Sequence, residues 1–388
     1  MLKRMRSFLV LVMLFITVTM SAQVTTATMS GKVTAQDEPI IGATIVAVHE
    51  PSGTRYGTVT NVSGQFNLQG MRTGGLYKVE ISYVGYQTAI YKGINLLLGE
   101  NYVLNVSLKE SSELLDEVVV TASKESNMKS DRAGAIMNAN RDMINSTPTI
   151  SRSISDIMRL SPQGADVGNG FAVGGGNYRQ SFVTVDGAAF NNTFGLGGNL
   201  PANGSPISLD ALEQVTVAVT PFDVRQSGFT GGAINAVTRS GDNQFRGTVY
   251  GYFNNENLRG DRVEDYKLTR SKSQYYTYGA SFGGPIIKDK LFFFVNGEYE
   301  DNVTAGSSYQ PRTSLDQEYT GNVRRPVENT IVDGNETWVG LNDMRQYLKE
   351  KYNYDPGRYN NYSVNTPAYR IMARLDWNIN KSHKLSLR

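Results

Sequence analysis

Residues 368–379 alternate without error between two kinds of side chain. One face of the strand would carry Arg370, Met372, Arg374, Asp376 and Asn378, and the other Tyr369, Ile371, Ala373, Leu375, Trp377 and Ile379. Strict period-2 alternation predicts a strand with a different solvent on each side. Charge on one face and apolar or aromatic groups on the other, over about ten residues, is typical of an outer-membrane β-barrel strand.

The same alternation recurs upstream and begins again at the C-terminus. The alternating segments are residues 245–254, 275–282, 293–300, 368–379 and 385–387. Their connections differ in length, with 255–273 long, 286–290 short, 302–366 very long and 380–383 short. Long extracellular loops and short periplasmic turns are the usual asymmetry of such barrels. We therefore expect residues 245–388 to be the first five or so strands of an antiparallel barrel, with 302–366 outside the cell and a solvated helix at 341–352.

The N-terminus has the pattern of a targeting segment. Its parts are a basic region with Lys3, Arg4 and Arg6, an apolar run from Phe8 to Met20, and the small pair Ser21-Ala22. This pattern predicts a secretory signal peptide over residues 1–22, with an uncleaved anchor as the alternative. No later stretch has 18 consecutive apolar residues, so we expect no helical membrane span.

Charge and cysteine content exclude several classes of protein. The chain has 38 basic and 36 acidic residues, and removing residues 1–22 leaves 35 against 36. The slight basicity therefore belongs to the targeting segment and does not indicate a nucleic-acid partner. There is no cysteine, which excludes disulfides and thiolate metal sites.

Two further segments lie between the N-terminus and the barrel pattern. Residues 28–110 contain short alternating runs separated by turn signals about every ten residues, which predicts a small β-sandwich of the immunoglobulin or prealbumin kind. Residues 124–241 are mixed, with a short helix expected near 153–160 and strands near 181–185 and 214–220. The overall fold class is mainly β, with one α+β segment in the middle.

Enzyme chemistry has no candidate constellation. His49 and His383 are the only histidines and neither has zinc-ligand spacing; His49 is expected to be a turn residue. No Gly-x-Ser-x-Gly elbow and no phosphate-binding loop with Lys occurs. Residues 333–337 faintly resemble a calcium loop, but Met344 stands where the closing Glu is needed. We expect no catalytic residue, no metal site and no cofactor.

The order of the segments resembles the TonB-dependent outer-membrane receptors of the Bacteroidetes type. The sandwich is similar to a carboxypeptidase-regulatory-like domain through Gly31-Lys32-Val33, residues 39–43, residues 60–66 and Tyr83-Val84-Gly85-Tyr86. The plug domain, 124–241, is similar through residues 182–187, 212–217 and 231–241. The resemblance implies a barrel of about 22 strands, so we expect this chain to be an N-terminal fragment with the first arc of the barrel.

The resemblance implies that the linker at 115–123 is a TonB box. The residues implied to bind TonB are Asp116, Glu117, Val118, Val119, Val120, Thr121 and Ala122. Three valines and a threonine favour extended structure, and an extended box can add to a partner sheet as an edge strand. A box must be releasable, so local order there should be low. The alternative is an ordinary first strand of the plug.

The cargo is less defined. Residues 220–229 depart from the Gly-Pro and Tyr-Gly pairs of many plugs and are closer to the Oar-like branch, so siderophore, vitamin B12 and glycan all lose support. The candidate substrate-binding residues are Phe190, Asn191, Asn192 and Phe194, on a loop tip of the plug. The alternative for these residues is packing against the barrel wall.

The sequence therefore predicts an outer-membrane receptor that moves a large solute, energised by TonB and its proton-driven inner-membrane motor through residues 117–122. The sandwich and box would lie in the periplasm, the barrel would contact outer-membrane lipid, and the resemblance allows a surface lipoprotein as a further partner. The competing hypothesis is a surface adhesion or assembly protein on the same scaffold without active transport.

Overall fold

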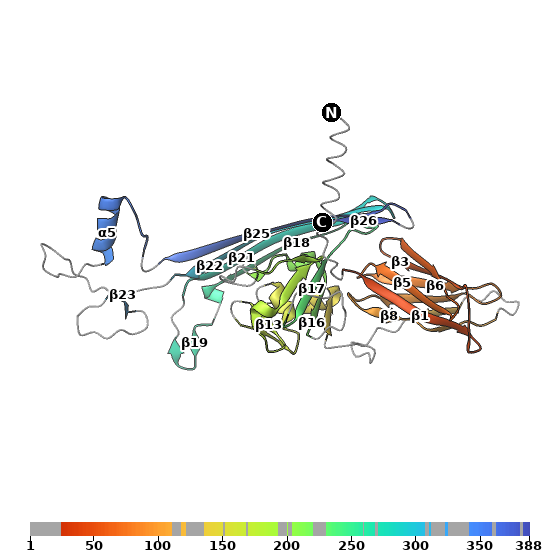
Figure 1. Ribbon diagram of the computed structural model, residues 1–388. Coiled ribbons are helices and arrows are strands. Elements are labelled where there is room, and N and C mark those ends of the chain that lie inside the picture. Colours follow the sequence, from red (N-terminus) through yellow and green to blue (C-terminus); the bar gives the residue numbers. More distant parts are fainter. Residues whose placement is uncertain are drawn as a thin grey trace, which may run out of the picture. The chain divides into compact units, whose positions relative to one another are not determined.

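The computed structural model of the chain (Figure 1) describes residues 25–110, 118–121, 136–149, 152–167, 170–192, 200, 204–219, 230–258, 260–267, 271–306, 310–311, 323–324, 341–358, 362–380 and 383–388. The predicted signal peptide lies outside the described residues, as does most of the long loop 302–366. The chain forms two compact units. The first contains the described parts of residues 1–248, 280–297 and 370–388, and the second those of 249–279 and 298–369.

The N-terminal β-sandwich is confirmed. One sheet has β1 (Ala27–Ala35) paired with β2 (Glu38–Pro39), β5 (Gln65–Met71), β8 (Asn101–Val103) and β9 (Val106–Ser107). The other has the order β10-β7-β6-β3-β4, formed by Val118–Thr121, Ala89–Asn95, Leu76–Ser82, Thr44–His49 and Thr54–Val59. Alternate residues of these strands, such as Met29, Ile45 and Ile81, are fully buried in one shared apolar core. The alternation seen in the sequence thus reflects an apolar interior and a wet surface.

One turn of the sandwich is held by side-chain hydrogen bonds. The Asn61 Oδ1 atom accepts hydrogen bonds from the backbone N–H groups of Ser63 and Gln65, both at 2.9 Å. The buried Thr60 hydroxyl accepts from the Ala43 N–H at 2.8 Å and donates to the Ile40 carbonyl at 2.7 Å. The pair Thr60-Asn61 therefore holds the turn before β5 and ties it to the loop after β2.

The middle segment, which is predicted to be a plug and is called the plug below, contains a five-stranded sheet and short helices. Its order is β11-β16-β17-β14-β15, formed by Ile136–Asn140, Leu212–Ala218, Ala233–Thr238, Phe182–Val185 and Ala188–Ala189. The other elements are α2 (Arg141–Ser146), α3 (Ile154–Met158), β12 (Gly164–Asp166), β13 (Phe171–Val173), η1 (Tyr178–Gln180) and η2 (Leu209–Ala211). Val215, Val217 and Ile234 pack against α3 residues Ile154 and Ile157 in a second apolar core.

The Asp186-Gly187 pair closes the plug hairpin between β14 and β15. Both residues have positive φ, 51° and 86°, and Val185 pairs with Ala188 across the turn. Two residues with positive φ are the requirement of a type I′ turn, which Asp-Gly satisfies at little steric cost. The Asp186 carboxylate also accepts hydrogen bonds from the N–H of Thr238, at 3.0 Å, and from its hydroxyl. The motif therefore fixes the end of β17 as well as the turn.

A buried polar row crosses the plug sheet. Asn138, Thr216, Asn235 and Thr184 stand in register on four neighbouring strands. The Thr216 hydroxyl donates to the Asn138 Oδ1 atom at 2.5 Å, and the Thr184 hydroxyl donates to the Asn235 Oδ1 atom at 2.7 Å. Polar groups in this buried row are thus hydrogen-bonded, and the row fixes the register of the sheet.

The barrel-like part is a five-stranded sheet in chain order. Its strands are β18 (Arg246–Asn255), β21 (Ser273–Ile287), β22 (Leu291–Ala305), β25 (Ser363–Asn378) and β26 (Lys384–Leu387), and the three longest lie side by side in Figure 1. The remaining elements are η3 (Glu256–Leu258), β19 (Arg262–Val263), β20 (Tyr266–Lys267), β23 (Gln310–Pro311), β24 (Val323–Arg324) and α5 (Leu341–Tyr352). The predicted strands and the predicted helix at 341–352 are confirmed, and the sheet does not close among the described residues.

Strand β25 has the two faces that the sequence predicts. Arg370, Arg374 and Asp376 are only 4%, 6% and 3% exposed, whereas Tyr369 and Ile371 on the other face are 72% and 87% exposed. No helix in the described part of the chain is long and apolar enough to cross a membrane.

Candidate functional site

The predicted TonB box is described only at its centre. Val118–Thr121 form β10, which pairs in parallel with β7 from Val118↔Ala89 to Thr121↔Lys92. Asp116, Glu117 and Ala122 lie outside the described residues. The segment is therefore an edge strand of the sandwich sheet and not a strand of the plug sheet, whose first strand is β11.

Three of the four predicted substrate-binding residues lie in the described part of the chain, and all three are half-buried. Phe190 is half-buried and packs against the plug core. The Asn191 Oδ1 atom accepts from the Val183 N–H at 2.6 Å, and its Nδ2 atom donates to the Ser181 carbonyl at 2.7 Å. Asn192 is half-buried, and Phe194 lies outside the described residues. The side chain of Asn191 therefore holds the start of β14, and contact with cargo stays a prediction for all four.

A charged cluster centred on Asp210 joins the plug to β18. Asp210 receives an ion pair from Arg141 at 2.9 Å and one from Arg239 at 3.6 Å. The hydroxyl of Thr248, on β18, donates a hydrogen bond to the Asp210 Oδ2 atom at 2.7 Å. Burial would raise the pKa of Asp210, but hydrogen bonds from Ser281, Thr248 and Arg141 outweigh it and bring the pKa below its ordinary value. Asp210 thus remains charged and connects the plug to β18 through Thr248.

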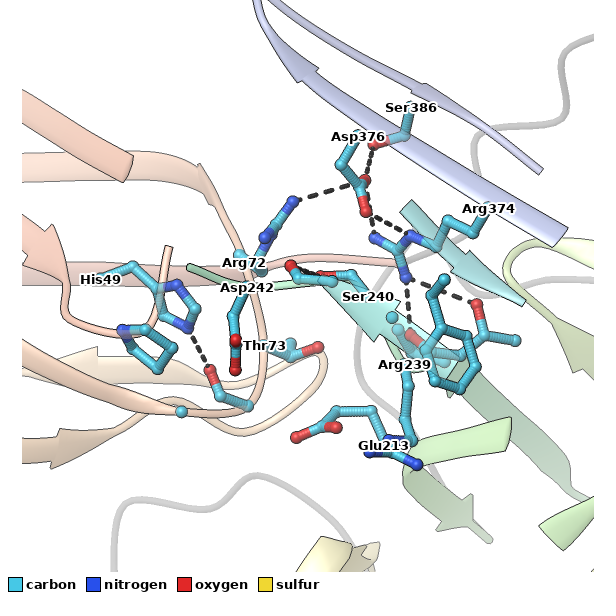
Figure 2. A pocket seen from close by; sticks show the side chains of 18 of the residues that line it. His49, Arg72, Thr73, Glu213, Arg239, Ser240, Asp242, Arg374, Asp376 and Ser386 are labelled. Carbon is cyan, nitrogen blue, oxygen red and sulfur yellow. Dashed lines mark hydrogen bonds and ion pairs between the residues drawn. The ribbon is translucent and has the colours of Figure 1, made fainter. Parts of the chain in front are cut away.

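Strand β25 supplies the second set of charged contacts to the plug. The Arg374 Nη1 atom donates to the Thr238 carbonyl at 2.6 Å, and the Arg370 Nε atom donates to the Ser205 carbonyl at 2.5 Å. Arg374 also forms an ion pair with Asp376 at 2.9 Å. Figure 2 shows Arg72, from the sandwich, reaching the same carboxylate, with a nitrogen–oxygen distance of 3.4 Å.

Arg72, Arg374 and Asp376 line a cleft of about 1010 Å³. Its basic lining residues are Arg72, Arg141, Arg239, Arg246, Arg374, Lys384 and Arg388. Glu213, on β16, is half-buried and lies against Gly74, where a Cβ atom would come within 2.2 Å of its Oε1 atom. Burial raises the pKa of Glu213 although the guanidinium groups of Arg141, Arg239, Arg374 and Arg72 oppose it. The arrangement favours anionic groups; the described residues contain no cluster of His, Cys, Asp and Glu suited to a metal ion.

His49, predicted to be a turn residue, instead ends β3 and is 5% exposed, which corrects that prediction. Its Nδ1 atom lies 2.7 Å from the Ser52 hydroxyl and its Nε2 atom 2.8 Å from the Gly74 carbonyl. Burial, with a smaller effect of Arg72, lowers the pKa of His49 to about 4. A neutral His49 therefore ties together two loops of the sandwich, a contact that depends on residues 25 positions apart and leaves no local sequence signal.

Comparison with known proteins supports the resemblance in two parts of the chain. Residues 28–109 match the model of the carboxypeptidase regulatory-like domain, and residues 237–388 match that of an outer membrane beta barrel domain. The TonB-dependent transporter Oar of Myxococcus xanthus is 26% identical over 244 residues, which are 61% of this chain. The TonB-dependent receptor SusC of Bacteroides thetaiotaomicron is 29% identical over 221 residues, or 53% of it. Each alignment covers 20% of the relative, so this chain spans about a fifth of their length.

Two solved structures that align with parts of the chain are a siderophore receptor and an outer membrane transporter. The siderophore receptor PirA of Acinetobacter baumannii aligns over 63% of this chain and 29% of its own, with 17% identity and a TM-score of 0.38. The outer membrane transporter YddB of Escherichia coli aligns over 63% and 31%, with 12% identity and a TM-score of 0.42. The two sequence relatives are named as a transporter and a receptor. The chain thus contains a carboxypeptidase regulatory-like domain and part of an outer membrane beta barrel domain, and it is related to the TonB-dependent receptors.

Proposed function

We propose that this chain is part of a transporter that moves a large solute across the outer membrane and is energised by TonB through residues 117–122. The sandwich and the box lie in the periplasm, and the energy comes from the proton-driven motor of the inner membrane. The proposal assigns no catalysis and no cofactor to the chain. It is supported by relatives named as TonB-dependent transporters and receptors.

The observation that carries the proposal is the polar contact between plug and barrel strands. Arg370, Arg374 and Thr248 reach the plug through hydrogen bonds to Ser205, Thr238 and Asp210. Such bonds contribute only about 0.5 to 1.5 kcal/mol each, or up to about 3 kcal/mol when charged, because water can replace the lost partner. Phe294 and Met372 add apolar contact with the plug core. A plug held mainly by replaceable polar contacts can rearrange inside a wall that stays folded.

A pulling force applied at the box would reach the plug through the chain that connects the two. A partner that adds a strand to residues 117–122 grips the chain mainly through backbone hydrogen bonds. Residues 122–135 connect this grip to Ile136, where β11 begins. Strand β11 is an edge of the plug sheet and pairs only with β16 among the described strands, through five residue pairs. Tension would therefore load an edge strand first, and separating it would open the plug sheet from one side.

Deleting residues 117–122 in the natural protein tests the proposal. A transported nutrient is first identified by finding one that cells use only when the gene is intact. Uptake of this nutrient is then compared between the wild type and the deletion variant. A Val119→Pro variant should behave like the deletion because proline lacks a backbone donor, and a Val119→Ile variant serves as the matched control. Loss of uptake in the first two variants with normal surface levels is expected. Unchanged uptake in the deletion would contradict the proposal.

A further inference from the structure

We propose that the outer edge of β7 is a strand-binding surface of the carboxypeptidase regulatory-like domain, and that its occupant is this chain's own segment Val118–Thr121. Docked there, the segment is withheld from the partner that would pull on it. The identity of that partner rests on the function proposed above, but the docking itself does not.

The backbone pairing is the first observation. Four consecutive residue pairs join β10 to β7 in parallel, and β7 is bonded to β6 along its other side. The sheet order β10-β7-β6-β3-β4 makes β10 the outermost strand. Without β10, β7 would present a bare edge, which is a template for any extended segment. The surface is thus defined by the backbone of Ala89–Asn95 and is specific for an extended strand.

The short tether is the second observation. Glu110 is bridged to Tyr86, and the Gln87 N–H donates to the Lys109 carbonyl at 2.9 Å. Val118 pairs with Ala89, only three positions beyond Tyr86. Only seven residues, 111–117, therefore separate Glu110 from Val118, whose pairing partners Tyr86 and Ala89 lie three positions apart. A loop this short makes the docking intramolecular, with a high effective concentration and a small closure entropy.

Strand length is the third observation. β10 has four residues, so it offers few backbone bonds compared with the six residue pairs between β3 and β6. Its residues, three valines and a threonine, are strong strand formers. The segment therefore favours pairing with another strand, but few backbone hydrogen bonds hold it. A strand held in this way can be displaced by a competing partner. A partner strand that pairs with the same backbone edge of the segment would compete with β7 for it.

Cysteine cross-linking tests the docking in the full chain, which contains no cysteine of its own. Thr121→Cys is combined with Lys92→Cys, its partner in the register. Neighbouring strands are about 4.8 Å apart, within the reach of a disulfide. The control combines Thr121→Cys with Val59→Cys, on β4, an exposed position four strands away and about 19 Å distant. We expect at least tenfold more disulfide in the first pair, and equal yields would overturn the proposal.

Hydrogen exchange provides a second measurement that needs no cysteine. Deleting residues 118–121 should speed exchange of the β7 amides that face outward, while β6 amides keep their protection. Unchanged exchange in β7 would overturn the docking even if a cysteine variant failed to fold.

The competition is tested by adding the purified periplasmic domain of TonB to the reduced Thr121→Cys, Lys92→Cys protein. We expect saturating TonB to slow disulfide formation at least fivefold. An unchanged rate despite measured binding would overturn the competition, because the partner would then be using the outer side of β10. Absence of any binding would contradict the proposed function, while the cross-linking yield would still decide the docking.

Discussion

The sandwich and strand β25 bury opposite kinds of residue. In the sandwich, Met29, Ile45 and Ile81 are fully buried and charged side chains such as Lys32 are exposed. In β25, Arg374 and Asp376 are buried, and Ile371 is 87% exposed. Both regions use the same period-2 alternation. Alternation therefore defines the two faces of a strand, whereas the solvents on either side decide which face is buried.

The largest expected effect comes from breaking the buried ion pair of β25. Arg374→Met leaves Asp376 with Arg72 at 3.4 Å and the Ser386 hydroxyl at 2.5 Å, and it removes the donor to the Thr238 carbonyl. We expect the free energy of unfolding to fall by about 3 to 5 kcal/mol, because the buried Asp376 loses its closer ion-pair partner and the Thr238 carbonyl loses its donor. Urea unfolding of the reconstituted protein measures it. The double variant Arg374→Met, Asp376→Met should recover part of the loss; no recovery would argue against a paired charge.

The next prediction places the same substitution on both exposed faces. Ile371→Arg should destabilise the protein by about 2 to 4 kcal/mol if that face meets lipid near the bilayer midplane. Val59→Arg, at a position of the sandwich that is 60% exposed, should change stability by no more than about 0.5 kcal/mol. Urea titrations of both variants in lipid vesicles measure the two values. Equal small effects would mean that Ile371 faces water.

A pH titration tests the sandwich alone, through His49. Its pKa of about 4 in the folded state lies below the unfolded value of about 6.5, so the unfolded state binds more protons between these values. The stabilisation that comes from neutral His49 should therefore be fully present above pH 6.5. It should be lost as the pH falls toward 4, which lowers the free energy of unfolding by at most about 3 kcal/mol. Hydrogen exchange of the β3 and β6 amides reports it. His49→Gln should flatten this dependence, and an unchanged slope would assign it to other groups.

The smallest effect concerns Asn191, predicted to contact cargo. Asn191→Ala removes the partners of the Val183 N–H and the Ser181 carbonyl. We expect a loss of about 1 to 2 kcal/mol in plug stability, because two backbone groups are left unsatisfied. Hydrogen exchange of the β14 amides measures it, with Asn192→Ala as the neighbouring control. An Asn191→Ala variant with unchanged exchange and impaired uptake would favour the cargo role instead.

Patterns confined to one segment could be predicted from the sequence, and pairings between distant segments could not. The alternation in β18, β21, β22 and β25 identified the barrel strands because the two solvents act on every second residue. The Asp186-Gly187 turn was visible because its backbone requirement is local. The pairing of β10 with β7 could not be predicted, because a parallel contact of four residue pairs leaves no pattern in the sequence of either strand. The ion pair between Arg72 and Asp376 joins residues about 300 positions apart, and neither residue alone indicates the other.

Site-directed spin labelling tests whether β25 has a polar side that faces the plug and an apolar side that faces lipid. Single cysteines at Ile371, Met372 and Ala373 of the otherwise cysteine-free protein would be labelled in outer-membrane vesicles and their collision rates with oxygen and with a water-soluble nickel complex compared. We expect preferential oxygen contact at Ile371 and Ala373 and protection from both reagents at Met372, which packs against the plug core. Equal access of the nickel complex to all three positions would contradict it.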